Sequence, residues 1–280
     1  MPASRTVLLT GAAGRIGTHL RALLPAHGHR LRLLDVRPVP GEPEAVIADL
    51  ADPAATTTDG ISSGEALRKA LDGVDAVVHL AGIPVEAPFA EILRANVEGT
   101  YRLYEAVREA GVRRVVLASS NHAVGFTPLP AEGGRPLPVE TPHRPDTFYG
   151  LSKCFGEDLA SLYRDRHGIE TVSLRIGACF PEPTSVRMLS VWLSPGDCAR
   201  LVHAALTAED VGHTVVYGSS ANTRAWWDLS PARALGYAPR DDSEPYAAAL
   251  LAAEAGTAQV GAGLVGGEFC GAEPPRRHPR

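Results

Sequence analysis

Tyr149 and Lys153 are the residues whose types and spacing point most directly to chemistry. They are four positions apart, so on a helix their side chains project from one face. An ammonium beside a phenol favours the phenolate, and a phenol whose pKa falls from about 10 towards neutrality can serve as a general base. The spacing predicts a proton-transfer pair, but Tyr-x-x-x-Lys is also common on helix surfaces and needs support from its surroundings.

One helix is predicted to carry this pair. Asp146 is expected to cap its N-terminus, and Gly168 to follow its last turn. Apolar residues that recur at helical spacing predict the buried stripe, with the Tyr149 face left free for chemistry. The residues of this stripe are Leu151, Phe155, Leu159 and Leu162.

A glycine turn near the start of the chain indicates a cofactor site. The apolar run 6–9 leads into Gly-x-x-Gly-x-x-Gly and then into a helix predicted over 18–24. A strand, a glycine turn and a helix in this order are typical of dinucleotide binding, because the backbone can approach a pyrophosphate at the helix N-terminus. The residues expected to bind the cofactor here are Gly11, Gly14, Arg15, Ile16 and Gly17.

Asp35 ends the next predicted strand, 31–34. A carboxylate at this position accepts hydrogen bonds from the adenosine ribose hydroxyls and repels a 2′-phosphate. The sequence therefore favours NAD over NADP as the cofactor. Arg37 could pair with a phosphate and would then weaken the preference.

Strands alternate with helices over most of the remaining chain. Strands are predicted at 46–48, 74–80, 112–118 and 171–175, and helices at 65–71 and 89–110. This alternation predicts an α/β fold with a Rossmann-type doubly wound parallel sheet, whose strand ends line the cofactor crevice. Besides Tyr149 and Lys153, the further cofactor contacts expected are Asp49, Leu50, Leu80, Ala81, Gly82, Asn96 and Ile176.

The pattern loosens after residue 175. Residues 1–175 are predicted to form the NAD-binding domain, including the Tyr149 helix. Residues 176–280 are predicted to form a smaller substrate-binding cap, partly interleaved with the first portion. A helix at 197–206 and a strand at 213–217 are expected in this later portion, without an alternating wound pattern.

Composition excludes several classes of protein. The 280 residues are 45% hydrophobic and 21% charged with a net charge of -5, so no electrostatic footprint for nucleic acid or an anionic membrane is expected. No apolar run approaches the roughly 20 residues of a membrane span, and no signal-type stretch precedes Thr6. The four cysteines form no Cys-x-x-Cys, which argues against a zinc site or a disulfide framework. A cytoplasmic protein is expected.

In chain order, the glycine turn, Asp35, Asp49-Leu50, Ser120 and Tyr149-x-x-x-Lys153 resemble the extended short-chain dehydrogenase/reductase family over essentially the whole chain. Longer stretches are similar to its uronate dehydrogenases. These stretches are Ser119-Ser120-Asn121-His122, residues 149–157, Leu174-Arg175-Ile176-Gly177, Pro181-Glu182-Pro183 and Arg187-Met188-Leu189-Ser190. The resemblance implies a homo-oligomer that oxidises a hexuronate at its anomeric carbon and yields an aldarolactone and NADH.

The resemblance also implies roles for individual residues. Tyr149 would be the base, Lys153 would lower its pKa and hold the nicotinamide ribose, and Ser120 would bind the reacting oxygen. Asn121, His122 and Arg187 would hold the sugar, with the Arg187 guanidinium gripping the carboxylate through two parallel hydrogen bonds. Without the surrounding matches, each of these three residues has a simpler explanation. Asn121 could end a strand, His122 could be an ordinary loop histidine, and Arg187 could be a surface charge.

The chain departs from the family pattern at Pro84 and Ala178, where serines that contact the sugar would be expected. The alternatives are a dehydrogenase of glucose or a sugar phosphate, a nucleotide-sugar epimerase or dehydratase, and an NAD-sensing regulator without activity. Asn121-His122 stands where dehydratases of the family place an Asp-Glu pair, which argues against dehydration. The presence of Ser120, Tyr149 and Lys153 together argues against a regulator.

Overall fold

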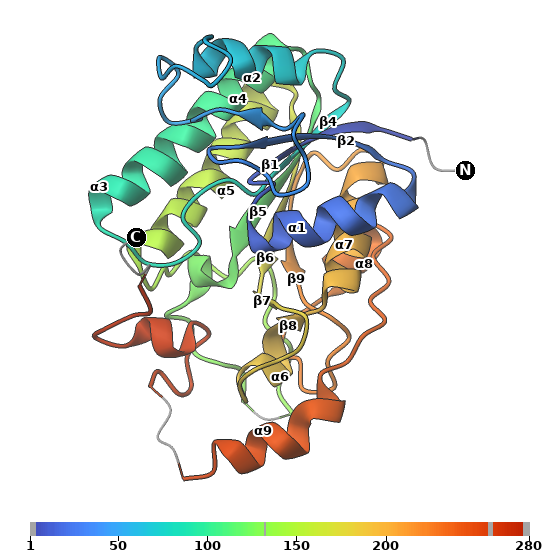
Figure 1. Ribbon diagram of the computed structural model, residues 1–280. Coiled ribbons are helices and arrows are strands. Elements are labelled where there is room, and N and C mark those ends of the chain that lie inside the picture. The colour runs from blue at the N-terminus through green and yellow to red at the C-terminus, as the bar shows by residue number, and fades with distance from the viewer. Residues whose placement is uncertain (1–3, 132, 257–259, 277–280) are drawn as a thin grey trace.

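A seven-stranded parallel sheet forms the centre of the protein (Figure 1). The computed structural model describes residues 4–131, 133–256 and 260–276, so the first residues examined for a signal stretch lie outside the described part. The strands lie in the order β3-β2-β1-β4-β5-β6-β9. Their bounds are β1 Thr6–Thr10, β2 Arg30–Asp35, β3 Val46–Ile47, β4 Ala76–His79, β5 Arg114–Ser120, β6 Glu170–Ile176 and β9 His213–Gly218.

The strand order reverses at β1. The chain passes from β1 to β2 and β3 on one side and returns to β4 on the other side of β1. Thr10 at the end of β1 pairs with Leu34 of β2 and with His79 of β4, so the loops after these strands leave the sheet at one edge. Doubly wound sheets bind ligands beyond the strand ends at such a reversal. The predicted fold class is confirmed.

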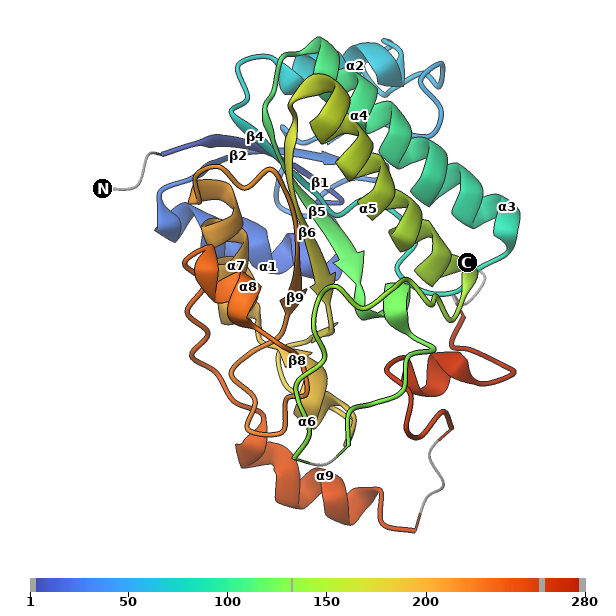
Figure 2. The same ribbon diagram turned by 180° about the vertical axis from the view of Figure 1, so that it is seen from behind.

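Helices cover both faces of the sheet (Figures 1 and 2). On one face, Leu20 and Leu201 pack in an apolar cluster with β1 and β6. On the other face, Leu67, Leu103 and Ala160 pack in a second cluster. The first face carries α1 (Arg15–Leu23), α7 (Pro195–Thr207) and α8 (Ser230–Ala234), and the second carries α2 (Ser63–Leu71), α4 (Gly99–Glu109) and α5 (Phe148–His167).

The helix predicted over 89–110 contains a π-helical segment that the sequence did not predict. It begins as α3 (Phe89–Ile92), continues as the π segment Leu93–Glu98 and ends as α4. Asn96 is the buried residue of this segment. Because π segments often mark functional sites, the contacts of Asn96 are described with the site.

Helix α5 begins at Phe148 and carries Tyr149 and Lys153. Thr147 is its N-cap, because the Thr147 hydroxyl accepts the N–H of Gly150 at 2.9 Å. The prediction that Asp146 caps the helix was therefore wrong: Asp146 lies one residue too early, and its carboxylate turns to His122 instead. The predicted end is confirmed, since Gly168 adopts the left-handed conformation that closes the last turn.

The predicted apolar stripe of α5 is only partly correct. Leu159 is buried and Phe155 packs against the same cluster, but Leu151 and Leu162 are 47% and 45% exposed. The side of the helix that faces the sheet instead carries small residues such as Gly156. A Cβ added at Gly156 would lie 3.3 Å from Leu117 of β5. Close approach to the sheet therefore selects small side chains, which a search for large apolar residues overlooks.

The portion after residue 175 contributes to the sheet as well as to the region beyond it. Helix α7 packs beside α1, and β9 pairs with β6 as the last strand, so the expectation of no wound pattern here was wrong for 195–218. The described residues beyond the strand ends include the short elements β7 (Ala178–Cys179), α6 (Met188–Val191), β8 (Trp192–Leu193), α9 (Ala247–Ala253) and the 3-10 turns Glu244–Tyr246 and Gly267–Cys270. No helix in the described ranges is long and apolar enough to cross a membrane.

Candidate active site

The glycine turn after β1 packs closely against the neighbouring backbone, as the turns of dinucleotide-binding folds do. Gly11 has a φ of +71°, and a Cβ there would lie 2.7 Å from the backbone of Leu80 and Ala81. A Cβ at Gly17 would overlap the carbonyl oxygen of Gly11. Gly14 caps α1 without a side-chain hydrogen bond, and the first turn has no acidic residue. The first N–H groups of α1 are therefore available to an anion, as the helix dipole favours.

Arg15 stands on the first turn of α1 with an exposed side chain. Its guanidinium lies over the ring of Phe180, 3.9 Å from the ring centroid, and this contact joins the glycine turn to the segment after β7. Ile16, the next residue, packs partly against the apolar cluster under α1. Arg15 is thus an exposed cation on the helix turn at which the phosphates are expected, whereas Ile16 is held by packing.

Asp35 is buried at the end of β2. Its carboxylate accepts the N–H of Ala13 at 2.9 Å and the N–H of Arg37 at 3.2 Å. The Arg37 side chain is exposed and donates to the carbonyl of Ala13 at 2.9 Å, with its Nε 4.0 Å from Asp35. Asp35 therefore stands beside the glycine turn, as the NAD prediction requires, and Arg37 lies close enough to influence the same position.

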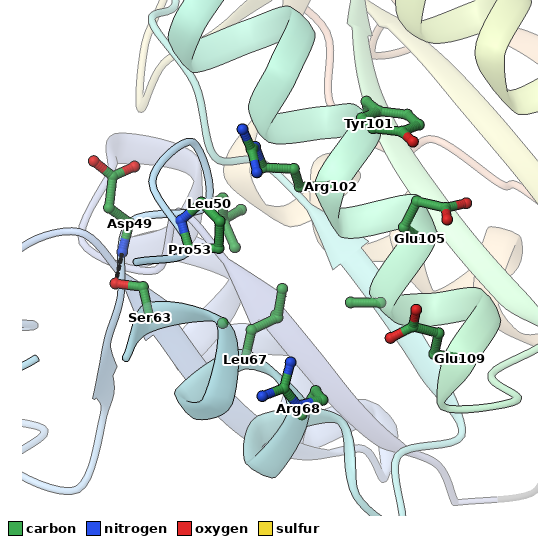
Figure 3. Close-up of a pocket in the computed structure, with 12 residues that line it drawn as sticks. Asp49, Leu50, Pro53, Ser63, Leu67, Arg68, Tyr101, Arg102, Glu105 and Glu109 are labelled. Carbon is green, nitrogen blue, oxygen red and sulfur yellow. Dashed lines mark hydrogen bonds between the residues drawn. The ribbon is translucent and has the colours of Figure 1, made fainter. Parts of the chain in front are cut away.

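Asp49 follows β3 and is fixed by two hydrogen bonds, from the N–H of Ala51 at 2.9 Å and from Arg94 at 2.7 Å. Asp49 and Leu50 also border a pocket of about 250 Å³ between α2 and α4 (Figure 3). Its other lining residues include Arg68 and Arg102 over an apolar floor. None of Ser120, Tyr149 and Lys153 lines this pocket, so it is not the place where the candidate base lies.

Asn96 fastens the loop after β4 to α5. Its Oδ1 accepts the N–H of Ile83 at 2.7 Å, and its Nδ2 donates to the carbonyl of Ile83 and to the hydroxyl of Ser152, each at 3.0 Å. Both amide protons are used within the protein. Asn96 therefore shapes the 80–83 loop, in which Leu80 and Ala81 face the glycine turn and Gly82 leaves room for the amide. A direct contact of Asn96 with a cofactor stays a prediction.

Tyr149 and Ser120 lie together at the end of β5, and both are buried. Burial raises the pKa of Tyr149 to about 12, a hydrogen bond from the Ser120 side chain opposes this shift, and the charge of Asp146 adds to it. The expected fall towards neutrality is thus absent in the protein alone, because the cost of desolvating a phenolate dominates. A further positive charge near the phenol is needed before Tyr149 can act as a base.

Lys153 lies beside Tyr149, with its ammonium 5.5 Å from the ring centroid. The Nζ donates to the carbonyl of Ala118 at 2.8 Å. Burial lowers the pKa of Lys153 to about 8, and the charge of Glu157, one turn further along α5, opposes the shift. Glu157 in turn forms hydrogen bonds with both Arg175 and His143. Lys153 therefore keeps much of its charge at neutral pH despite its burial.

Asn121 and Arg187 are in contact. In the orientation that satisfies its neighbours, the Asn121 amide donates to the carbonyl of Ile176 at 3.0 Å and accepts from Nη2 of Arg187 at 2.8 Å. The same Nη2 donates to the carbonyl of Val265 at 2.6 Å. Both protons of this nitrogen are therefore used, so the predicted two-pronged grip on a carboxylate was wrong for the structure described. Nη1 remains for a ligand, whereas Nε is buried and has no hydrogen-bond partner among the described residues.

His122 lies between Tyr149 and the C-terminal segment. Its ring centroid is 5.9 Å from that of Tyr149 and 4.0 Å from that of Phe269. Nδ1 lies 2.7 Å from the carboxylate of Asp146. Burial lowers the pKa of His122, while the hydrogen bond and the charge of Asp146 oppose the shift.

The two departures from the family pattern fall in different settings. Pro84 is exposed and directly follows Ile83, whose backbone Asn96 holds. Ala178 is buried in an apolar cluster with Tyr217 and Trp227. Neither side chain has a hydrogen-bonding group, so polar recognition near them must come from other residues.

Sequence analysis missed Asp146, Val265 and Phe269 as parts of this site. Val265 and Phe269 lie in a glycine-rich C-terminal stretch, for which the sequence predicts neither a helix nor a strand. Their positions depend on long-range backbone contacts, such as that of the Gly266 N–H with the carbonyl of Gly125 at 2.8 Å. No local signal in the sequence could have placed them beside His122 and Arg187.

A model of the NAD dependent epimerase/dehydratase family matches residues 7–188. This range contains the glycine turn, Asp35, Ser120 and the Tyr149–Lys153 pair. The chain belongs to this family. The matched range therefore contains the candidate catalytic and cofactor-binding residues described above. It also includes Arg187, which lies one residue before its end.

Relatives within the family are similar over most of the chain. A uronate dehydrogenase of Pseudomonas syringae pv. tomato is 49% identical over 86% of this chain and 84% of its own. One of Pseudomonas putida is 45% identical over 94% and 97%, respectively. The structure of a mutant uronate dehydrogenase from Agrobacterium tumefaciens in complex with NAD superposes with a TM-score of 0.84 at 40% identity, covering 96% of this chain and 97% of that one.

Proposed function

We propose that the chain is an NAD-dependent dehydrogenase that oxidises a hexuronate, such as glucuronate or galacturonate, at the anomeric carbon to the aldarolactone. The observation that carries this proposal is the contact of Asn121 with Arg187. Asn121 directly follows Ser120, so a guanidinium suited to a sugar carboxylate is tied to the residue next to the Ser120–Tyr149 pair. The similarity to uronate dehydrogenases supports the same substrate class.

NAD, when bound, accepts the hydride from the anomeric carbon. The residues present fit it: the glycine turn and Arg15 would meet the pyrophosphate at the start of α1, and Asp35 would meet the adenosine ribose. Asp49, Leu50 and the 80–82 loop line the strand ends on either side. Lys153 and Ile176 are the contacts we assign to the nicotinamide half.

Tyr149 takes the proton of the anomeric hydroxyl while the C–H bond of the same carbon gives up its hydride. Ser120 binds the reacting oxygen and donates to it, which holds that oxygen beside the phenol. Lys153 supplies positive charge that favours the phenolate. Burial keeps Tyr149 neutral in the protein alone, so the base is generated only when additional positive charge enters the site.

Arg187 is proposed to recognise the carboxylate through Nη1, because both protons of Nη2 are used within the protein. Burial lowers the pKa of Arg187. A carboxylate bound at Nη1 would compensate the buried charge. Asn121 and His122 would bind sugar hydroxyls beside it.

Self-association and location are inferred from other features. Phe89 of α3 and Phe148 of α5 are 51% and 46% exposed, with ring centroids 5.2 Å apart. Leu93, one turn after Phe89, and Leu151, one turn after Phe148, are exposed as well. A second copy of the chain is the partner we propose for these exposed side chains, which makes the protein a homo-oligomer. All four cysteines are free thiols, which agrees with a cytoplasmic location.

The test of the function is the stoichiometry of the products. Purified protein, NAD and galacturonate should yield one NADH and one aldarolactone for each sugar consumed, with the lactone identified by NMR. A uronate epimer or a dehydrated sugar as the product would refute the proposed reaction. Size-exclusion chromatography with light scattering tests the oligomer, and a monomer at micromolar concentration would refute that inference.

A further inference from the structure

The contact between His122 and Asp146 has no part in the reaction described above. Nδ1 of His122 lies 2.7 Å from Oδ2 of Asp146. The side chain of Asp146 has no exposed surface, and that of His122 is 10% exposed. The ring centroid of the imidazole lies 5.9 Å from that of Tyr149 and 4.0 Å from that of Phe269. A carboxylate and an imidazole are thus buried together beside the candidate base.

The hydrogen bonds of Asp146 define where the proton lies. Oδ1 of Asp146 accepts from the hydroxyl of Thr147 at 3.0 Å. That hydroxyl oxygen accepts the N–H of Gly150, so its single proton is free to point at Asp146. An ionised carboxylate has no proton to donate, so opposite Asp146 as a carboxylate it is Nδ1 of His122 that carries the proton of the contact. Burial lowers the pKa of His122, so the ring is neutral at neutral pH and Nε2 keeps its lone pair.

Close backbone packing holds the Asp146 carboxylate in place. An added Cβ at Gly125 or at Gly266 would overlap Oδ2, and one at Gly150 would lie 3.1 Å from Oδ1. Three separate stretches of the chain therefore enclose the carboxylate. A carboxylate packed in this way has little room to turn away from His122.

We propose that Asp146 is a positioning residue that fixes His122 in the Nδ1–H tautomer, so that Nε2 accepts a hydrogen bond from a hydroxyl of the sugar. Within the described part of the chain, Nε2 makes no hydrogen bond of its own. The free groups of Lys153 and Arg187 are donors only. Nε2 of His122 therefore supplies an acceptor that these cations cannot, and a hydroxyl in the matching position is selected. This inference rests on the proposed function because it names how that site reads its sugar.

The tautomer is measured first, by nitrogen-15 NMR of the histidine rings in the protein without sugar. The unaltered protein should show His122 as the Nδ1–H tautomer. In Asp146→Asn, the amide can accept from Thr147 and donate to Nδ1, so His122 should change to the Nε2–H tautomer. An Nε2–H tautomer in the unaltered protein overturns the inference. This measurement is independent of the reaction, so it separates failure of the inference from failure of the proposed function.

Kinetics then test whether Asp146 acts through His122. Asp146→Asn should lower kcat/KM for the uronate by at least about tenfold, mainly through a higher KM, because Nε2–H would present a donor to a hydroxyl proton. His122→Ala should cause a similar loss, and adding Asp146→Asn to it should cause little more. Asp158→Asn, which changes an exposed carboxylate on α5, is the control for the same type of exchange and should leave the kinetics unchanged. Equal losses from Asp146→Asn with and without His122 would show a general structural role and overturn the inference.

Discussion

Nη2 of Arg187 lies 2.6 Å from the carbonyl oxygen of Val265, which is 78 residues further along the chain. The same nitrogen is bound to Asn121 beside the candidate base. One side chain therefore connects the strand-end residues with the C-terminal segment that carries Phe269. Recognition of a carboxylate by Arg187 and the packing of that segment are coupled as a result.

Arg187→Ala should raise the KM for glucuronate and galacturonate steeply and change any weak activity on glucose little, because glucose has no carboxylate. Each lost charge-assisted hydrogen bond is worth about 1.5–3 kcal/mol. Steady-state kinetics with the three sugars measures this. Equal losses on all three would mean that Arg187 only holds Val265 and Asn121 in place.

Arg187→Lys should also impair uronate oxidation markedly. A lysine keeps the charge, but its single ammonium cannot bind Val265, Asn121 and a carboxylate in the geometry of a planar guanidinium. The thermal midpoint should fall as well, because the C-terminal segment loses an anchor. Arg233→Lys, the same exchange on α8, is the control and should leave the kinetics and the thermal midpoint unchanged. Unchanged kinetics in Arg187→Lys would argue that only the charge matters.

Tyr149→Phe should lower turnover by about 10²–10⁴-fold, the usual effect of losing a general base, and leave the affinity for NAD nearly intact. The ring can still pack against Ile83 and Ile92, but no oxygen is left to take the proton. Tyr101→Phe, an exposed tyrosine on α4, should behave like the unaltered protein. Near-normal turnover in Tyr149→Phe would remove Tyr149 from the mechanism.

The rate of oxidation should depend on pH in both directions. Tyr149 must lose a proton to act, and burial raises its pKa to about 12, so kcat/KM should increase as the pH rises from acid towards neutrality. Lys153 has a pKa of about 8, so above that pH it loses the charge that favours the phenolate, and the increase should level off or reverse. A profile that is flat between pH 6 and 9, measured where the protein is folded throughout, would contradict both assignments.

NAD should be preferred over NADP by at least about tenfold in kcat/KM, a difference of roughly 1.4 kcal/mol. The preference rests on the Asp35 carboxylate beside the glycine turn, which repels a 2′-phosphate. Asp35→Ala should reduce the preference for NAD, and Arg37→Ala should leave this preference unchanged or increase it. Equal use of both cofactors by the unaltered protein would indicate that Arg37 governs the ribose position.

The protein should lose stability in mild acid because of a histidine contact far from the site. His29 is buried, and its Nε2 lies 3.0 Å from Nδ1 of His203. Burial, together with the charges of His203 and His27, lowers the pKa of His29 to about 4. The unfolded chain therefore binds more protons between pH 6.5 and 4, so stability is complete above about pH 6.5 and declines as the pH falls through that window. His29→Gln should reduce the loss of unfolding free energy over this pH range, as measured by urea titration. An unchanged pH dependence would rule out His29 as its source.

Sequence patterns predicted the features that depend on local order. The glycine turn, the alternation of strands and helices and the spacing of Tyr149 and Lys153 are all local, and the structure places them as expected. The Thr147 cap could not be told from an Asp146 cap, since both side chains are good caps and only the direction of the Asp146 carboxylate towards His122 decides between them.

Features that depend on distant contacts were missed or mistaken. The place of β9 in the sheet requires its pairing with β6, and the position of Phe269 over His122 requires the packing of Gly266 against Gly125. The pKa of Tyr149 depends on how deeply the ring is buried, which residue spacing does not reveal. That only Nη1 of Arg187 remains for a ligand likewise follows from a remote segment, because the carbonyl oxygen of Val265 accepts a hydrogen bond from Nη2.

The central claim is tested most directly by comparing initial rates of NAD reduction with glucuronate, galacturonate, glucose and glucose 6-phosphate under the same conditions. The account predicts that the two uronates give a kcat/KM at least about tenfold above that of either other sugar, since a carboxylate at Arg187 contributes more than 1.4 kcal/mol. A higher kcat/KM with glucose 6-phosphate would contradict the assignment of Arg187 to a carboxylate and, with it, the uronate substrate.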